Sequence, residues 1–187
     1  MISISMCMIV KNEQDILARC LDSYAGTYDE LIIVDTGSTD NTKEIAAHYT
    51  DKIYDFEWIN DFSAARNFAF SKAGCDYIFS ADADEVLDDT NNYALRELKH
   101  MLLPEIDIVQ MYYVNASEYN SVYNARSFSK GSVHSHGFHQ YMKQYGSRQS
   151  YITVTLKFFT CRRTTIAKET FQHISKHLKK VSTLKIM

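Results

Sequence analysis

The 187-residue sequence has little proline, little glycine and no long apolar run. One proline, six glycines and 45% hydrophobic residues, many of them aromatic, are typical of an ordinary globular domain. No apolar run approaches the length that spans a bilayer. The first apolar segment, residues 2–10, has no basic region before it and no small-residue cleavage site after it. We therefore interpret it as a strand and not as a signal peptide.

Several motifs are missing as well. The four cysteines have no CxxC spacing, which disfavours a zinc site and fits reduced, buried thiols in a cytosolic protein. Neither GxGxxG nor GxxxxGK(S/T) occurs, which argues against a dinucleotide oxidoreductase and a P-loop enzyme. The net charge of −3 argues against a general nucleic-acid binder.

Acidic residues are almost absent from the end of the chain. Residues 1–129 hold 22 of the 23 acids and 9 of the 20 bases, a net charge of −13, whereas residues 130–187 carry +10. This break predicts a core over residues 1–129 and a distinct basic part over residues 130–187. The basic part is either a face that binds anions or a membrane surface, or a divergent or out-of-frame end without selected chemistry.

The first part alternates apolar runs with helical patterns. The predicted strands cover residues 2–10, 31–34, 52–56, 75–81 and 106–114. Helical patterns separate them, with Asn12 as a cap of the first and Asp61 or Ser63 as a cap of the third. Such an alternation predicts an α/β fold with a mainly parallel sheet covered on both faces. Right-handed crossovers make it Rossmann-like and doubly wound.

The most informative segment is YIFSADADE, residues 77–85. An apolar strand runs into Asp82 and Asp84, which alternation along a strand would place on one face. Two such carboxylates repel each other unless a cation or the hydroxyls of a ligand lie between them. Mg²⁺ and Mn²⁺ take oxygen ligands and keep positions open for substrate phosphates. The segment predicts a metal–diphosphate site at the carboxyl end of the sheet; the alternative is a solvated acidic loop that caps the next helix.

Polar residues also follow two other strands. Lys11, Asn12 and Glu13 come after the first strand, where a helix cap and a first-turn acid would explain the last two. Asp35 ends the second strand, and the Gly-Ser-Thr turn at residues 37–39 presents N–H groups at a helix start. A carboxylate at such a strand end accepts from ribose or base donors in nucleotide-binding folds; the alternative is a capped turn. Neighbouring strand ends converge, so these groups can share a cleft with the acidic pair.

Four sequence blocks carry a resemblance to family 2 glycosyltransferases. In order they are CMIVKNE at 7–13, IVDTGSTDNT at 33–42, DFSAARN at 61–67 and ADADE at 81–85. The sequence resembles most the bacterial branch that decorates cell-surface polysaccharide or lipopolysaccharide cores, over roughly residues 1–115. The resemblance implies the GT-A fold and a nucleotide-diphosphate sugar donor, often a uridine one.

The resemblance also implies roles on the nucleotide side. The segment that matches Val10, Lys11, Asn12 and Glu13 would line the nucleotide pocket. Asp35 would contact the base or the ribose.

Roles near the diphosphate are implied in the same way. Arg66 would lie beside the nucleotide and Asp82 would face the ribose. Asp84 would bind the Mn²⁺ or Mg²⁺ that bridges the diphosphate. For Arg66 there is a second interpretation, a helix-surface charge paired with Asp61 or Glu57.

Candidates for the catalytic base are few. An inverting displacement needs a carboxylate that deprotonates the acceptor hydroxyl, and the only acids after Asp107 are Glu118 and Glu169. Gln140 stands where the family pattern would place an acid. We therefore expect the donor to bind while transfer is weak or absent, with residues 130–187 forming short strands and a basic last helix. The strand residues Ile152, Val154, Leu156 and Phe158 are predicted to share one face.

The sequence as a whole predicts a glycosyltransferase. It would bind a uridine-type sugar donor through Mn²⁺ or Mg²⁺ and transfer the sugar, with inversion, to a saccharide or lipid-linked acceptor. A cytoplasmic location is expected, with the basic part touching the inner face of the membrane and no nucleic-acid partner. The alternatives are a non-catalytic donor-binding remnant, a GT-A nucleotidyltransferase and a haloacid-dehalogenase phosphatase. The sequence lacks the glycine-rich loop that is typical of GT-A nucleotidyltransferases. Its Asp-x-Asp also does not lie near the start of the domain, as it does in haloacid-dehalogenase phosphatases.

Overall fold

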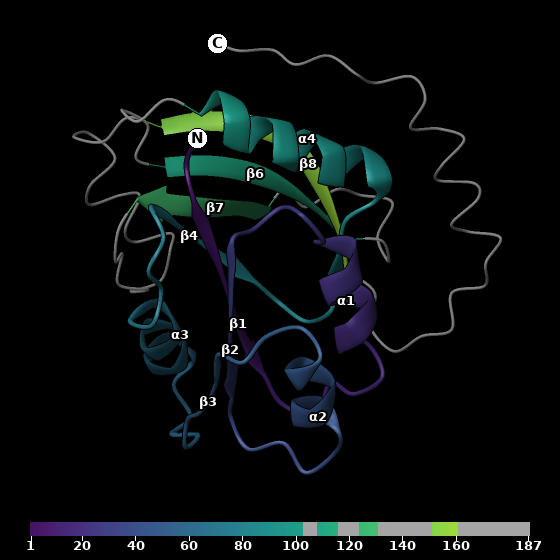
Figure 1. Cartoon of the computed structure of the whole chain (residues 1–187), viewed down its shortest axis with the longest axis vertical. Coiled ribbons are helices and arrows are strands. Elements are labelled where there is room, and N and C mark those ends of the chain that lie inside the picture. Colours follow the sequence, from purple (N-terminus) through teal and green to yellow (C-terminus); the bar gives the residue numbers. More distant parts are fainter. Residues whose placement is uncertain (103–107, 116–123, 131–150, 161–187) are drawn as a thin grey trace, which may run out of the picture.

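The computed structural model describes residues 1–102, 108–115, 124–130 and 151–160. Its first half holds four parallel strands, β1 (Ile4–Val10), β2 (Glu30–Asp35), β3 (Ile53–Asp55) and β4 (Tyr77–Ala81). They lie in the order β3-β2-β1-β4, so that β1 pairs with both β2 and β4. The chain therefore winds outward from β1 in both directions, as the doubly wound prediction requires (Figure 1).

Further strands extend the same sheet beyond β4. They are β5 (Glu85–Val86), β6 (Ile108–Asn115), β7 (Asn124–Lys130) and β8 (Tyr151–Thr160). The full order is β3-β2-β1-β4-β7-β6-β8-β5, and β7 runs antiparallel to both β4 and β6. The sheet is thus parallel on one side of β4 and mixed on the other.

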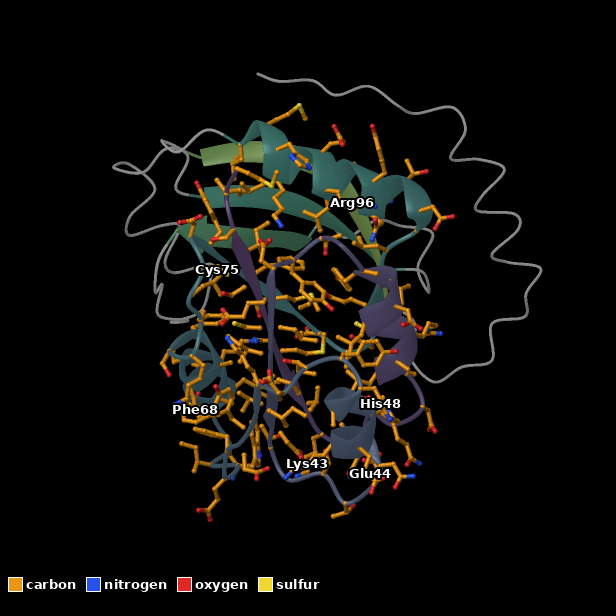
Figure 2. All side chains as sticks on the ribbon, viewed as in Figure 1. Lys43, Glu44, His48, Phe68, Cys75 and Arg96 are labelled. Atoms are coloured by element: carbon orange, nitrogen blue, oxygen red, sulfur yellow. The ribbon has the colours of Figure 1, made fainter. Side chains whose placement is uncertain are left out.

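Helices cover both faces because residues of the central strands alternate between two cores. Helices α1 (Leu17–Ser23), α2 (Thr42–Ala47) and α4 (Asp89–Met101) pack over one face, and α3 (Phe62–Phe70) packs over the other. The larger core takes alternate residues of β1, namely Ile4, Met6, Met8 and Val10. The smaller core takes Cys7 with Ala69 of α3. Figure 2 shows Phe68 of α3 and His48 of α2 on opposite sides of the sheet.

A network of hydrogen bonds closes the amino edge of the sheet, where the first strands begin. The carboxylate of Glu30, at the start of β2, accepts from the backbone N–H of Gly74 at 2.8 Å, from the hydroxyl of Ser5 and from Lys52. Ser5 is buried in β1, so one carboxylate connects β1, the segment before β3 and the segment before β4. This edge lies opposite the carboxyl ends where the ligand site is predicted.

The predicted elements agree with the structure except at the first helix. That helix begins at Leu17 with Ile16 as its N-cap and has no side-chain cap and no acid in its first turn. The prediction that Asn12 caps it is therefore wrong. Asp61 does cap α3, accepting from the N–H groups of Ser63 and Ala64 at 2.8 and 3.2 Å.

The basic part contributes β8 to the sheet, which confirms a strand there. Its pairing with β6 shifts register, since Met111 lies opposite Val154 and Tyr113 lies opposite Phe158. Ile152, Val154 and Phe158 nevertheless lie opposite alternate residues of β6, namely Val109, Met111 and Tyr113, and the common face of their side chains stays a prediction. The boundary near residue 130 stays a prediction, and the predicted last helix lies outside the described residues.

Candidate functional site

The candidate site lies at the carboxyl edge of the parallel strands. Val10 of β1 lies level with Asp35 of β2, which lies level with Asp55 of β3. The segments after these residues, and the turn after β4, therefore emerge at one edge of the sheet. Such an edge is where open α/β sheets bind ligands.

The segments after β1 and β2 are joined by hydrogen bonds. The backbone N–H of Asn12 donates to the hydroxyl of Ser38 at 2.9 Å, and the Asn12 Oδ1 accepts from the N–H of Thr39 at 2.8 Å. Asn12 adopts a left-handed conformation with φ of 55°, which asparagine tolerates better than most residues. The N–H of Glu13 donates to Thr42 Oγ1 at 2.7 Å. Asn12 thus braces two neighbouring loops instead of capping a helix.

The other residues predicted after β1 differ in accessibility. Val10 is buried, and its carbonyl accepts from the N–H and the hydroxyl of Thr36 at 3.0 and 3.1 Å. Lys11 is exposed and Glu13 is half-buried. Val10 is one of the four residues predicted to line the nucleotide pocket. Because it is buried, its backbone can position the neighbouring residues, but its side chain offers little contact to a ligand.

Asp35 organises the turn that follows β2. Its side chain is 1% exposed. Both carboxylate oxygens accept from the N–H of Ser38, at 2.8 and 3.0 Å, and Oδ1 also accepts from Gly37 at 3.3 Å. Gly37 has φ of 101°, a conformation that favours glycine. The capped-turn interpretation therefore describes this carboxylate, and its contact with a nucleoside stays a prediction.

Arg66 connects α3 to the acidic turn after β4. Its Nη2 lies 3.1 Å from Oδ1 of Asp82, and the two side chains are 32% and 34% exposed. The partner of Arg66 is thus Asp82 and not Asp61, which caps its own helix. Within the part of the chain that the structure describes, Nε of Arg66 is buried and has no hydrogen-bond partner. The pair brings two predicted donor-binding residues together.

The acidic motif forms a turn and not a continuation of β4. The strand ends at Ala81, and the N–H of Glu85 donates to the carbonyl of Asp82 at 3.1 Å. Strand alternation therefore cannot be the reason for Asp82 and Asp84 to share one face, because the backbone has already left the strand, and their common orientation stays a prediction. Asp84 is half-buried in the middle of the turn.

Glu85 is a residue that the sequence analysis did not single out. It is fully buried, and its Oε2 accepts from the N–H of Asp82 at 3.1 Å. Its position in the sequence could have identified it, because it stands directly between the acidic pair and the apolar residues Val86 and Leu87, which are both buried.

The donor atoms of the turn suit a divalent cation shared with a ligand. Among the described residues no group of three or more His, Cys, Asp or Glu could hold a metal on its own. Mg²⁺ and Mn²⁺ at diphosphate sites take one or two carboxylates and complete their coordination with phosphate oxygens and water. Asp84 fits this requirement, because it is a hard oxygen ligand that is still partly exposed.

The thiol of Cys20 lies beside the same turn. Its burial, followed by the charges of Glu85 and Asp84, raises the pKa of Cys20 well above its ordinary value. The thiol therefore stays protonated and donates to the carbonyl of Asp82 at 3.5 Å. The base candidates Glu118 and Glu169, and Gln140, lie outside the described residues.

Comparison with known proteins defines the class of this site. Residues 5–174 match the family described as Glycosyl transferase family 2. The chain therefore belongs to the family 2 glycosyltransferases, and the match extends beyond the roughly 115 residues over which the sequence blocks carry the resemblance.

Three curated proteins are similar to part of this chain. The chain is 48% identical over 87 residues to a TPR repeat-containing protein of Synechococcus elongatus. It is 32% identical over 102 residues to the SPbeta prophage-derived glycosyltransferase SunS of Bacillus subtilis. It is also 32% identical over 108 residues to the lipopolysaccharide core biosynthesis glycosyltransferase LpsC of Rhizobium meliloti. These alignments cover 46%, 54% and 56% of this chain, but only 22%, 24% and 38% of the relatives.

A solved structure shows the fold. Glucosyl-3-phosphoglycerate synthase from Mycobacterium tuberculosis, in complex with Mn²⁺, uridine diphosphate and glucosyl-3-phosphoglycerate, superposes with a TM-score of 0.65. The superposition covers 95% of this chain and 79% of that one, at 16% identity. The chain therefore has the predicted GT-A fold.

Proposed function

We propose that the carboxyl edge of β1, β2 and β4 binds a nucleotide-diphosphate sugar of the uridine type together with Mn²⁺ or Mg²⁺. The chain would thereby supply the donor site of a glycosyltransferase. The observation that carries this proposal is the contact between Arg66 of α3 and Asp82 of the acidic turn. This contact places the guanidinium of Arg66 at the turn that carries Asp82 and Asp84. The turn emerges at the same edge of the sheet as the two loops that Asn12 joins.

The comparisons support the choice of ligand. Two structures of the Mycobacterium tuberculosis enzyme hold uridine diphosphate, one with Mg²⁺ and the other with Mn²⁺. In this chain Asp84 would hold the metal, Arg66 would lie beside the diphosphate, and the loop after Asp35 would take the nucleoside. A bound divalent cation would offset the charge that develops on the leaving diphosphate.

Transfer to an acceptor is the second part of the proposal. A saccharide or lipid-linked acceptor and an inverting displacement follow from the family resemblance, and the name of LpsC supports a cell-envelope acceptor. Among the described helices none is long and apolar enough to cross a membrane. A cytoplasmic location, with the basic residues 130–187 at the inner face of the membrane, would bring a lipid-linked acceptor within reach. Without a base, transfer would be slower by about 10²–10⁴-fold.

The substitution Asp84→Asn tests the donor site. Calorimetric titration with uridine diphosphate, with and without Mn²⁺, should show metal-dependent binding in the parent protein and none in the variant. The thermal midpoint should stay unchanged, because a partly exposed carboxylate in a turn adds little to the core. Asp89→Asn is the matched control, since it removes an exposed acid five residues away in α4. Metal-dependent affinity that survives in Asp84→Asn would remove Asp84 from the site.

A further inference from the structure

The acidic turn after β4 contains a carboxylate that cannot reach a ligand. Glu85 has no exposed surface, whereas Asp84 beside it is partly exposed. Glutamate is almost never fully buried unless its charge or its oxygens are engaged. The burial of Glu85 therefore indicates a role inside the protein and not at the ligand surface.

Glu85 closes the turn from both sides. Its backbone N–H donates to the carbonyl of Asp82, and its Oε2 accepts from the backbone N–H of the same residue, each at 3.1 Å. Ala83 and Asp84 lie between these two contacts, and Ala83 is buried. The backbone direction at Asp84 is thus set by a closed ring of hydrogen bonds.

Two other elements hold the same residue of the turn. The thiol of Cys20 in α1 donates to the carbonyl of Asp82 at 3.5 Å, and Arg66 in α3 holds its carboxylate. On the far side, Glu85 begins β5, where it lies opposite Thr160 of β8. The turn is therefore anchored to helices on both faces of the sheet and, through β5 at the edge of the sheet, to β8, while Asp84 is left at its middle.

We propose that Glu85 is a positioning residue that holds Asp84 in the orientation needed to bind the divalent cation, without touching the cation itself. This inference rests on the proposed donor site. Groups that orient a metal ligand typically change metal affinity by about 10–100-fold when they are replaced. The feature that matters is the oxygen that accepts from the N–H of Asp82, and not the charge of Glu85.

Two substitutions separate the oxygen from the charge. Glu85→Gln keeps an acceptor oxygen at the same reach but removes the charge. Glu85→Asp keeps the charge but is one methylene shorter and cannot reach the N–H of Asp82. Mn²⁺ is titrated into each full-length protein in the presence of uridine diphosphate, and free Mn²⁺ is followed by electron paramagnetic resonance. We expect affinity within about threefold of the parent for Glu85→Gln and a loss of about tenfold or more for Glu85→Asp.

The control is the same shortening at the opposite edge of the sheet. Glu30→Asp also weakens a hydrogen-bonded carboxylate, so it should lower the thermal midpoint while leaving Mn²⁺ affinity unchanged. Equal losses of affinity in Glu30→Asp and Glu85→Asp would assign the effect to general destabilisation and overturn the inference.

Each remaining outcome is also decisive. Weak Mn²⁺ binding by Glu85→Gln would show that the charge matters and overturn the positioning role, even if the shorter variant does not fold. Parental affinity in Glu85→Asp would overturn it as well. A parent protein that binds no Mn²⁺ with uridine diphosphate would instead refute the proposed donor site on which the inference rests.

Discussion

At the scale of single residues, Asp35 shows how far a sequence pattern carries. An acid at the end of an apolar strand is visible in the sequence, and its position at the carboxyl edge is confirmed. Its hydrogen bonds to the N–H groups of Gly37 and Ser38 are not visible, because they depend on the backbone path of the turn. The same holds for Glu85, which is buried and lies in a strand that pairs with Thr160, 75 residues later in the chain.

Replacing Asp35 should affect ligand binding and folding together. We expect Asp35→Ala to weaken uridine monophosphate and uridine diphosphate equally, by roughly 1.5–3 kcal/mol, as for a lost hydrogen bond to a charged group. The thermal midpoint should fall as well, since the N–H of Ser38 loses its acceptor. Titration with both nucleotides and thermal unfolding measure the two effects. Parental affinity for both nucleotides would exclude Asp35 from nucleoside binding.

At the scale of elements, helix caps were predictable only where they are local. Asp61 accepts from N–H groups two and three residues later, so its role can be predicted from a short window of sequence. Asn12 has the same residue type in a similar place before a helix, yet its side chain bonds to Thr39, 27 residues away. The side chain of Asn12 thus bonds to a residue distant in the sequence, although the local pattern predicted that it caps a helix.

The cap of α3 should matter for stability and for the position of Arg66. We expect Asp61→Ala to lower the free energy of unfolding by about 0.5–2 kcal/mol, the usual cost of losing an N-cap. Urea denaturation measures this change. Asp51→Ala is the control, because Asp51 is an exposed acid outside the helices of the described chain. A variant as stable as this control would show that the Asp61 hydrogen bonds contribute nothing.

At the scale of the whole molecule, the parallel half of the sheet was predictable and the mixed half was not. Right-handed crossovers constrain the order of β1 to β4. The order of β5 to β8 depends on pairings between segments far apart in sequence, for which a single sequence has no local signal. The candidate site follows the same division, since Asp35, Arg66, Asp82 and Asp84 all belong to the predictable half.

The amino edge should give the molecule part of its pH dependence. Burial alone would raise the pKa of Glu30, but the hydrogen bonds from Gly74, Lys52 and Ser5 outweigh it and lower this pKa below its ordinary value of 4.5. A carboxyl whose pKa is lower in the folded protein stabilises it above the unfolded pKa, and this contribution disappears as the pH falls through the folded pKa.

The matching experiment compares the parent with Glu30→Gln between about pH 7 and pH 3. We expect the variant to be less stable at neutral pH, by about 1.5–3 kcal/mol, because hydrogen bonds to a charged group are lost. The difference should narrow as the pH falls, since the parent then also loses its charge. A difference that stays constant over this range would show that Glu30 does not titrate with folding.

The hydrogen bonds between Asn12, Ser38 and Thr39 have a consequence for inhibitor design. These contacts are hydrogen bonds between groups of the protein itself, so the chain holds the two loops that border the candidate site against each other. Rigid ligands keep more of their interaction energy than flexible ones when the receptor is already ordered. For the proposed uridine-type donor site, small, stiff uracil mimics would therefore be better starting points for a chemical probe than long, flexible analogues of the whole sugar donor.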